Sequence, residues 1–124
     1  MTCLVVQGIH LLVMRKSNPS FLNGVPELLV LQLLARREMY GYEIVRSIQT
    51  TSKETFAFGE GSIYPVLHEL ESKKLVKSRR QEVEGRSRLY YSHTASGRKR
   101  LEFLTQQWEH VTAGVGHVLG GAHA

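Results

Sequence analysis

The first strong hydrophobic pattern follows Pro26, where ELLVLQLLA is apolar on almost every side of a helix. A helix of this kind is buried on all faces, so it is expected at the centre of the fold. A polar break follows, and a second helix is predicted at 40–50, with apolar positions at Tyr40, Ile44 and Ile48. Gly41 lowers helix propensity there by about 1 kcal/mol, and a close crossing with another helix would explain its presence.

A third helix is predicted within 59–76, GEGSIYPVLHELESKKLV. Ser62 is a suitable N-cap, which makes Pro65 the third helical residue, where a missing amide hydrogen costs little. The apolar stripe consists of Ile63, Val66, Leu67 and Leu70, and the opposite face of Tyr64, Pro65, His68, Glu69 and Ser72. Hydrogen-bonding groups on that outer face fit either solvent or a polar partner, and this segment alone favours neither.

Two β-capable runs, VKSRRQEV and RSRLYYSHT, flank a short turn at Glu84 and Gly85 and predict a hairpin. The expected fold is mainly α with a small β-hairpin. Three helices followed by a basic hairpin is the order of a winged helix-turn-helix, in which the third helix enters the major groove and the hairpin is the wing.

The last segment has a heptad pattern. Thr94 can cap a helix that begins at Ala95. Apolar residues then recur at steps of 3, 4, 3, 4 and 3: Leu101, Leu104, Trp108, Val111, Val115 and Val118. Two heptads are short for an autonomous coiled coil, so the helix either packs back on its own domain or pairs with a second copy. We favour the dimer, because a domain this small has little spare core for a further long helix.

These patterns divide the chain into an N-terminal extension (1–24), a winged helix-turn-helix (25–94), a dimerisation helix (95–119) and a tail (120–124). The extension contains an apolar run, CLVVQGIHLLVM, that is too short to span a bilayer. Three interpretations remain for it: an extra packed helix or strand, a disordered tail, or residues upstream of a true start at Met14. We favour the third as a hypothesis, because the folded pattern is complete without them.

Basic residues are concentrated after the third helix. The chain of 124 residues carries 16 Lys and Arg against 11 acids, a net charge of +5. Ten of the 16 basic residues lie between Lys73 and Arg100, against two acids, Glu82 and Glu84. Such a block is typical of a surface that binds phosphates, although an anionic membrane surface could use the same charge.

Several enzyme classes are excluded by missing residue types. All 11 acids are Glu, so the chain has no aspartate for a Ser-His-Asp triad, and Cys3 is the single cysteine. His110 and His117 are seven residues apart, about two helical turns, which is too far to hold one metal ion. Neither GxGxxG nor GxxxxGK[ST] is present. We therefore expect no catalytic site, no metal site and no cofactor.

Five segments resemble the PadR family of bacterial transcriptional regulators, in its short form with one C-terminal helix: PELLVLQLLA, MYGYEIVRSI, GEGSIYPVLHELESKKLV, GRSRLYYSHTASGRKRL and the later Trp108. The resemblance covers about 24–119. It implies a cytoplasmic, homodimeric winged-helix repressor that binds a palindromic operator. It also implies that a small aromatic or phenolic effector releases the DNA.

Two residues depart from the family pattern. Glu69 stands where the reading helix often has a basic residue, which makes a phosphate contact from that position doubtful. His93 stands where an apolar residue usually precedes the threonine, so the last core contact of the wing is expected to be polar or altered.

The expected DNA contacts come from the second helix, from the third helix with its N-terminus, and from the wing: Tyr40, Ser62, Tyr64, His68, Arg86 and Arg88. Ser62 and the helix N-terminus suit a phosphate, and His68 suits a base edge. Tyr64 fits a phosphate or sugar contact about as well as a structural role.

For the effector, the resemblance implies a pocket near Trp108, the single tryptophan. A packed interface residue is the simpler interpretation of this side chain. A different class of function also remains open, in which the chain is a basic helical adaptor for a protein partner or an anionic membrane surface.

Overall fold

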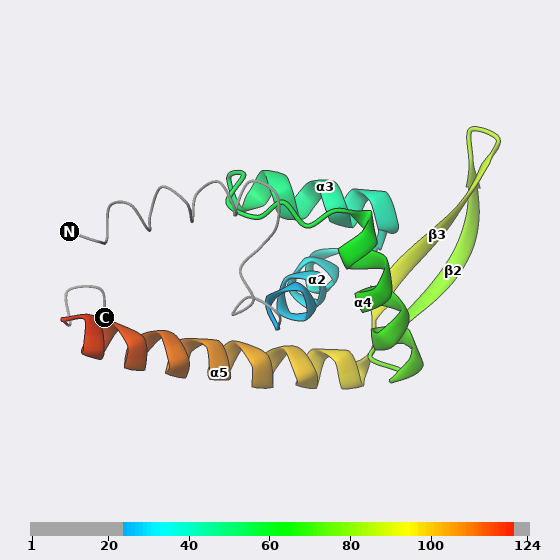
Figure 1. Cartoon of the computed structure of the whole chain (residues 1–124). Helices are drawn as coiled ribbons and strands as arrows, with labels where there is room; N and C mark the ends of the chain where they lie inside the picture. The colour runs from blue at the N-terminus through cyan, green and yellow to red at the C-terminus, as the bar shows by residue number, and fades with distance from the viewer. Residues whose placement is uncertain (1–23, 121–124) are drawn as a thin grey trace.

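The computed structural model describes residues 24–120, with helices and strands at α2 (Val25–Arg36), β1 (Met39–Tyr40), α3 (Gly41–Thr51), α4 (Glu60–Ser72), β2 (Val76–Val83), β3 (Arg86–His93) and α5 (Ala95–Leu119) (Figure 1). Apart from Gly24 and Gly120, the expected N-terminal extension and tail lie outside the described residues. The order of helices and hairpin is the predicted one, and the fold class, mainly α with a small sheet, is confirmed.

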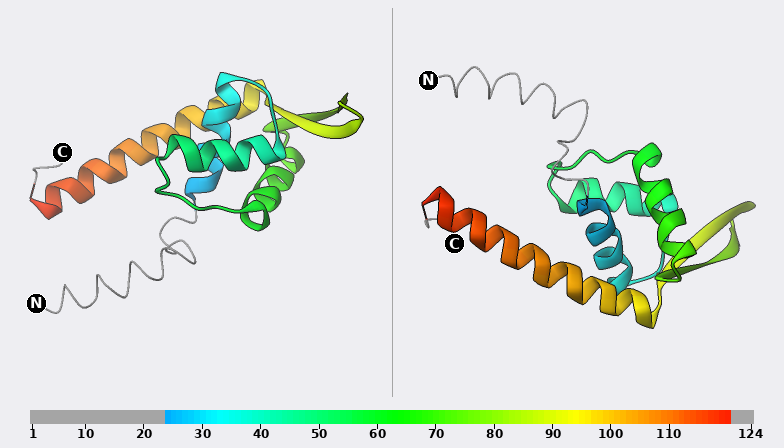
Figure 2. Two further views of the ribbon diagram at one scale, coloured as in Figure 1. Left: turned by 90° about the horizontal axis from the view of Figure 1, so that it is seen from above. Right: turned by 60° about the horizontal axis from the view of Figure 1, so that its bottom comes forward.

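Helix α2 lies at the centre of the domain, as its continuous apolar surface predicts. It contacts α3, α4, α5 and β3, and Val30, Leu31 and Leu34 on it are almost completely buried. The predicted stripe of α4 faces this core through buried Ile63, Leu67 and Leu70 and partly buried Val66. Figure 2 shows the hairpin and the far end of α5 projecting from opposite sides of the helices.

The wing is the hairpin that the sequence predicts. Strands β2 and β3 pair in register from Val76↔His93 to Val83↔Arg86. Glu84 and Gly85 form the two-residue turn with φ of 54° and 77°, as type I′ hairpin turns require.

The sheet contains one strand that the sequence did not indicate. Met39 and Tyr40 pair with Tyr91 and Tyr90, which gives the order β1-β3-β2. Tyr40, expected inside the second helix, is therefore the residue before α3. Its extended conformation comes from pairing with a strand some 50 residues away, and local periodicity carries no signal for such a contact.

The predicted start of α4 is wrong. The helix begins at Glu60 with Gly59 as its N-cap, so Ser62 is already helical and Pro65 is the sixth helical residue. The backbone amides of Ser62 and Ile63 both donate to the carbonyl of Gly59 at 3.1 Å, which closes the first turn earlier than expected. Because proline has no N–H, the carbonyl of Gly61 lacks its usual i+4 donor, and Gly61 and Pro65 are both exposed.

Gly41 allows the close crossing that the sequence suggested, although it is the first residue of α3 and not an interior one. A Cβ added to Gly41 would lie 2.5 Å from Cε1 of Tyr64 on α4. The ring of Tyr64 therefore occupies the space that any larger residue would need.

Helix α5 starts where predicted and is fixed to the domain at its first turns. Thr94 caps it by accepting from the amide of Gly97 at 3.0 Å. Gly97 itself lies against the turn between α4 and β2, since an added Cβ would be 2.0 Å from the carbonyl oxygen of Leu75. Arg100 forms a bidentate ion pair with Glu27 of α2, with N–O distances of 2.8 and 3.2 Å.

We expect Gly97→Ala to destabilise the domain by about 1–3 kcal/mol, because the new methyl group meets backbone that cannot rotate away. Gly114→Ala in the same helix is the matched control. Among the described residues, no atom outside its two neighbours and the backbone of its own helix lies within 4 Å of the Cβ it would add, so better helix propensity should stabilise the protein by up to about 1 kcal/mol. Urea unfolding measures the change in stability of both variants. Equal changes in the same direction would contradict the close contact at Gly97.

Candidate nucleic-acid interface

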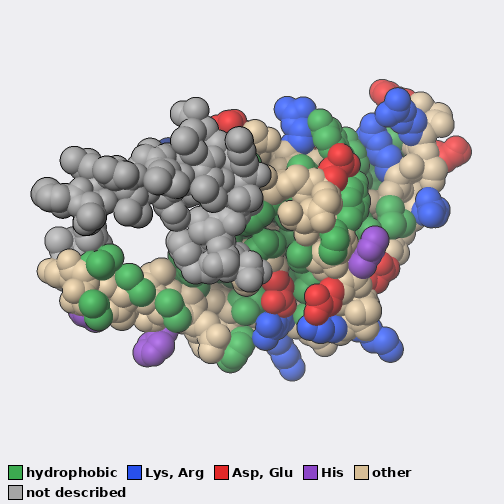
Figure 3. Space-filling view, viewed as in Figure 1, with side chains coloured by type: hydrophobic (Ala, Val, Ile, Leu, Met, Phe, Trp, Pro, Cys, Tyr) green, Lys and Arg blue, Asp and Glu red, His purple; other side chains and the backbone are tan. Residues whose placement is uncertain are grey.

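A hollow of about 290 Å³ lies between α4 and the wing. We call it the tyrosine hollow, and it is lined by Tyr40, Gly41, Tyr64, His68, Ser87, Arg88, Leu89 and Tyr91. Figure 3 shows Lys and Arg side chains gathered over the adjacent hairpin. The tyrosine hollow therefore combines hydroxyl and imidazole groups with a guanidinium beside a basic surface.

Four of the six residues predicted to contact DNA meet in this hollow. Tyr40 comes from β1, Tyr64 and His68 from α4, and Arg88 from β3. The guanidinium of Arg88 lies 4.4 Å from the ring centroid of Tyr40, a cation–π contact that limits its orientation. His68 is exposed, so its ring is accessible to a partner.

Tyr64 combines the two roles that the sequence left open. Its ring packs over Gly41 and is partly buried against the core, while its side chain also lines the hollow. Burial raises the pKa of Tyr64, with smaller contributions from Glu60 and Tyr40. The phenol therefore keeps its proton at neutral pH and can donate a hydrogen bond to a phosphate oxygen.

The other two predicted DNA contacts lie outside the hollow. Arg86 is exposed at the tip of the wing, next to the turn. Ser62 is exposed on the first turn of α4, but the residue nearest the helix start is Glu60. A carboxylate there already complements the helix dipole and repels phosphate, so this helix end suits an anion less well than the sequence suggested.

The alternation of the hairpin adds one basic residue that sequence reasoning missed. Arg80 pairs directly with Leu89, so both side chains lie on the face of the wing that borders the tyrosine hollow. Arg80 also approaches Ser87, with 3.4 Å between Nη1 and Oγ. Once the turn is placed at Glu84, the period of two identifies this face, so the signal was present in the sequence.

Part of the basic block is neutralised within the molecule. Arg79 pairs with Glu38 at 2.6 Å, Arg100 with Glu27 at 2.8 Å and Lys73 with Glu69 at 3.0 Å. The block therefore presents fewer charges to a partner than its sequence count indicates.

Both departures from the family pattern take part in contacts within the molecule. Glu69 is exposed beside Lys73, and the two form an i,i+4 pair. Nδ1 of His93 lies 3.1 Å from the carbonyl oxygen of Leu34, one of the last four carbonyls of α2, which lack helical donors. Because a carbonyl only accepts, Nδ1 donates and His93 caps α2, so the contact is polar, as expected.

The heptad residues of α5 fall into two groups. Leu101 and Leu104 are partly buried against the domain's own core. Trp108, Val111, Val115 and Val118 are exposed by 47, 56, 51 and 88%. A second hollow of about 220 Å³ borders Trp108, and Val25, Leu28, Leu104, Gln107 and Val111 complete most of its wall. We call it the tryptophan hollow.

Within residues 24–120, no helix combines the length and apolarity needed to cross a membrane. In the same range, no three His, Cys or Glu side chains lie close enough together to hold a metal ion.

Comparison with known proteins identifies similar regulators. The sequence model of the transcriptional regulator PadR-like family matches residues 30–103. The transcriptional regulator Rv3488 of Mycobacterium tuberculosis is 29% identical over 104 residues, covering 81% of this chain and 94% of that protein. A transcriptional regulator from Clostridium thermocellum superposes with a TM-score of 0.75 at 28% identity, over 82% of this chain and 99% of that one. A PadR-like transcriptional regulator from Bacillus cereus superposes with a TM-score of 0.72 at 33% identity, over 82% of this chain and 98% of that one.

Replacing Arg86 by Ala is expected to weaken binding to preferred and random duplexes alike, because phosphate contacts carry no sequence information. The slope of log affinity against log salt concentration should become shallower by roughly one. Fluorescence anisotropy over a salt series measures both quantities.

His68→Ala is the contrasting variant. If His68 reads a base edge, its loss lowers the preference for one sequence over another and leaves the salt slope unchanged. Equal losses on both duplexes would rule out base reading by His68, and an unaltered slope for Arg86→Ala would remove the wing tip from the interface.

Proposed function

Since the chain belongs to the PadR-like family of transcriptional regulators, we propose that it represses transcription as a homodimer bound to a palindromic operator. Members of this family are DNA-binding regulators and not enzymes. DNA-binding regulation therefore follows from membership, while the repressor activity, the symmetry of the operator and the effector are the content of the proposal.

The convergence of Tyr40, Tyr64, His68 and Arg88 on one hollow is the observation that carries the proposed mode of binding. Duplex DNA presents a phosphate backbone beside each groove, and a helix in the major groove places neighbouring elements against that backbone. With α4 in the groove, hydroxyl and guanidinium groups of the tyrosine hollow face a phosphate. Exposed His68 then faces the base edges, and Arg86 at the wing tip reaches the adjacent backbone.

The exposed part of α5 supports the dimer. Trp108, Val111, Val115 and Val118 form a continuous apolar stripe along two heptads, and contiguous exposed apolar surface is typical of an interaction site. Pairing with an identical stripe would bury it and relate the two reading helices by a two-fold axis. A two-fold dimer matches two half-sites in inverted orientation, separated by about one helical turn of DNA.

The tryptophan hollow supports an aromatic effector. Leu28 and Val111 supply apolar surface, Trp108 a flat ring and Gln107 a hydrogen-bonding amide. A small phenol fits these groups, because its ring stacks on indole and its hydroxyl needs a polar partner. Since one wall is α2 and the other α5, a bound effector would act on the angle between the domain and its dimer helix.

Selection from a random duplex pool tests the operator. We expect an inverted repeat with half-site centres about 10 base pairs, or a multiple of that distance, apart. Val111→Glu with Val115→Glu should give a monomer that has lost about 100-fold or more in affinity for the full site and binds a single half-site normally. Gln106→Glu with Ala113→Glu adds the same charge on the opposite face of α5 as the control. A selected sequence without symmetry, or a parent protein that is monomeric at binding concentrations, would contradict the proposal.

Release of DNA by a phenol tests the effector site. With 4-hydroxybenzoate as the probe, we expect saturable quenching of Trp108 fluorescence and dissociation of the complex with the selected duplex. Trp108→Leu should keep DNA binding and lose the response. Leucine still packs in the apolar stripe of α5, but it has no ring on which a phenol can stack. Phe103→Leu on the same helix lies outside the tryptophan hollow and should respond as the parent does. A response that survives Trp108→Leu would place the effector elsewhere.

A further inference from the structure

A second set of contacts lies on the other face of the wing. Side chains alternate along β2 and β3, so Arg79, Gln81 and Tyr90 lie on the face opposite Leu89 and Tyr91, which line the tyrosine hollow. Tyr40, which pairs with Tyr90, and Arg88, which pairs with Gln81, lie on this face as well, and both also line the hollow. The role proposed above for the interface uses only these two residues of this face.

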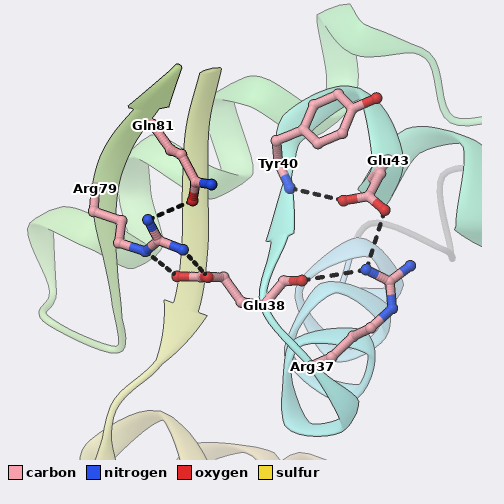
Figure 4. A network of polar contacts seen from close by, with 6 residues as sticks. All are labelled: Arg37, Glu38, Tyr40, Glu43, Arg79 and Gln81. Atoms are coloured by element: carbon pink, nitrogen blue, oxygen red, sulfur yellow. Dashed lines mark hydrogen bonds and ion pairs between the residues drawn. The ribbon is translucent and has the colours of Figure 1, made fainter. Parts of the chain in front are cut away.

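The central contact there joins residues 41 positions apart in sequence. Glu38, in the turn between α2 and β1, accepts two hydrogen bonds from Arg79 of β2, from Nε at 2.8 Å and from Nη2 at 2.6 Å (Figure 4). The third nitrogen of the guanidinium donates to Oε1 of Gln81 at 2.7 Å. A bidentate pair of this kind fixes orientation as well as distance. We call this contact the Glu38–Arg79 brace.

The brace continues to the first turn of α3. Nη1 of Arg37 donates to the backbone carbonyl of Glu38 at 3.3 Å and pairs with Oε2 of Glu43 at 3.0 Å. The other carboxylate oxygen of Glu43 accepts from the amide of Tyr40 at 3.2 Å. A line of polar contacts therefore runs from the wing to the start of the helix that supports α4.

Aromatic contacts connect the brace to the tyrosine hollow. The guanidinium of Arg79 lies 5.3 Å from the ring centroid of Tyr90. Tyr90 meets Tyr40 edge to face with 5.5 Å between centroids. The guanidinium of Arg88 lies over the other ring of this pair, 4.4 Å from the ring centroid of Tyr40. The position of Arg79 is thus coupled through two rings to a guanidinium that faces the proposed phosphate.

We propose that Glu38 is a positioning residue for operator recognition, because its bond to Arg79 sets the angle of the wing relative to α3 and α4. This inference rests on the proposed function, since it assumes that wing and reading helix engage one site together. The outer half of the hairpin is mostly exposed and needs a fixed base if its arginines are to meet DNA without further loss of conformational entropy.

An electrostatic role and a positioning role for Glu38 predict opposite effects of its replacement on operator affinity. An acid beside a DNA-binding wing repels phosphates and neutralises Arg79, so electrostatics alone predicts tighter binding when Glu38 is replaced by Gln. If Glu38 acts by holding the wing, the same change weakens binding to the operator. The sign of the effect therefore separates the two roles.

The experiment compares Glu38→Gln with Glu82→Gln, which removes an acid of the same charge from the exposed part of β2. Affinities are measured for the duplex selected from the random pool and for a random duplex. Glu82→Gln should bind both more tightly. Glu38→Gln should also bind the random duplex more tightly, yet lose roughly five- to tenfold on the selected duplex.

A charge swap separates positioning from direct contact. Glu38→Arg with Arg79→Glu reverses the pair and leaves the net charge unchanged. It should recover selected-duplex affinity to within about threefold of the parent, while either single change does not. Thermal melting of each variant checks that the fold is intact, and the swap also serves if a single variant melts early.

Two results would overturn the role of Glu38. One is a Glu38→Gln protein that gains affinity on both duplexes as Glu82→Gln does. The other is a folded swap that fails to recover and has a shallower salt slope, which would mean that Arg79 contacts phosphate itself. If the parent protein shows no preference for any selected duplex, the proposed operator fails first, and the inference fails with it.

Discussion

The described domain depends on the burial of one helix, α2. Its side chains are apolar on nearly all sides and contact α3, α4, α5 and β3, so each of these elements is positioned by the part of α2 that it covers. Burial of apolar surface stabilises the fold by about 25 cal/mol for each Å² removed from water. Two glycines allow the close approaches that this arrangement needs, Gly41 beneath the ring of Tyr64 and Gly97 against the carbonyl of Leu75.

The hairpin carries different chemistry on its two faces because its side chains alternate. Leu89 and Tyr91 on one face border the hollow beside α4, and Arg79 on the other face bonds to the turn that precedes β1. Tyr40 contributes to both, since it lines the hollow and also meets Tyr90. A residue expected only to contact DNA is therefore also part of the support of the wing.

Features with a local or periodic origin could be predicted from the sequence. The helices, the Glu84–Gly85 turn and the Thr94 cap follow from hydrophobic period and turn or cap chemistry. Features that depend on residues distant in sequence could not be predicted in this way. The pairing of Met39 with Tyr91 and the bond between Glu38 and Arg79 are of this kind. The start of α4 was placed too late because Ser62 is a good cap by type, whereas the backbone closes its first turn on Gly59.

Helix α5 is continuous from Ala95 to Leu119, and Gly97, Arg100, Leu101 and Leu104 in its N-terminal half pack on the domain. Val111, Val115 and Val118 in its C-terminal half are exposed. At 1.5 Å per residue its length is about 37 Å. If a helix of that length rotates by about 5° about its C-terminal end, its N-terminal end moves by roughly 3 Å. In the proposed dimer, small rotations between the paired rods would thus become base-pair-scale changes in the separation of the two reading helices.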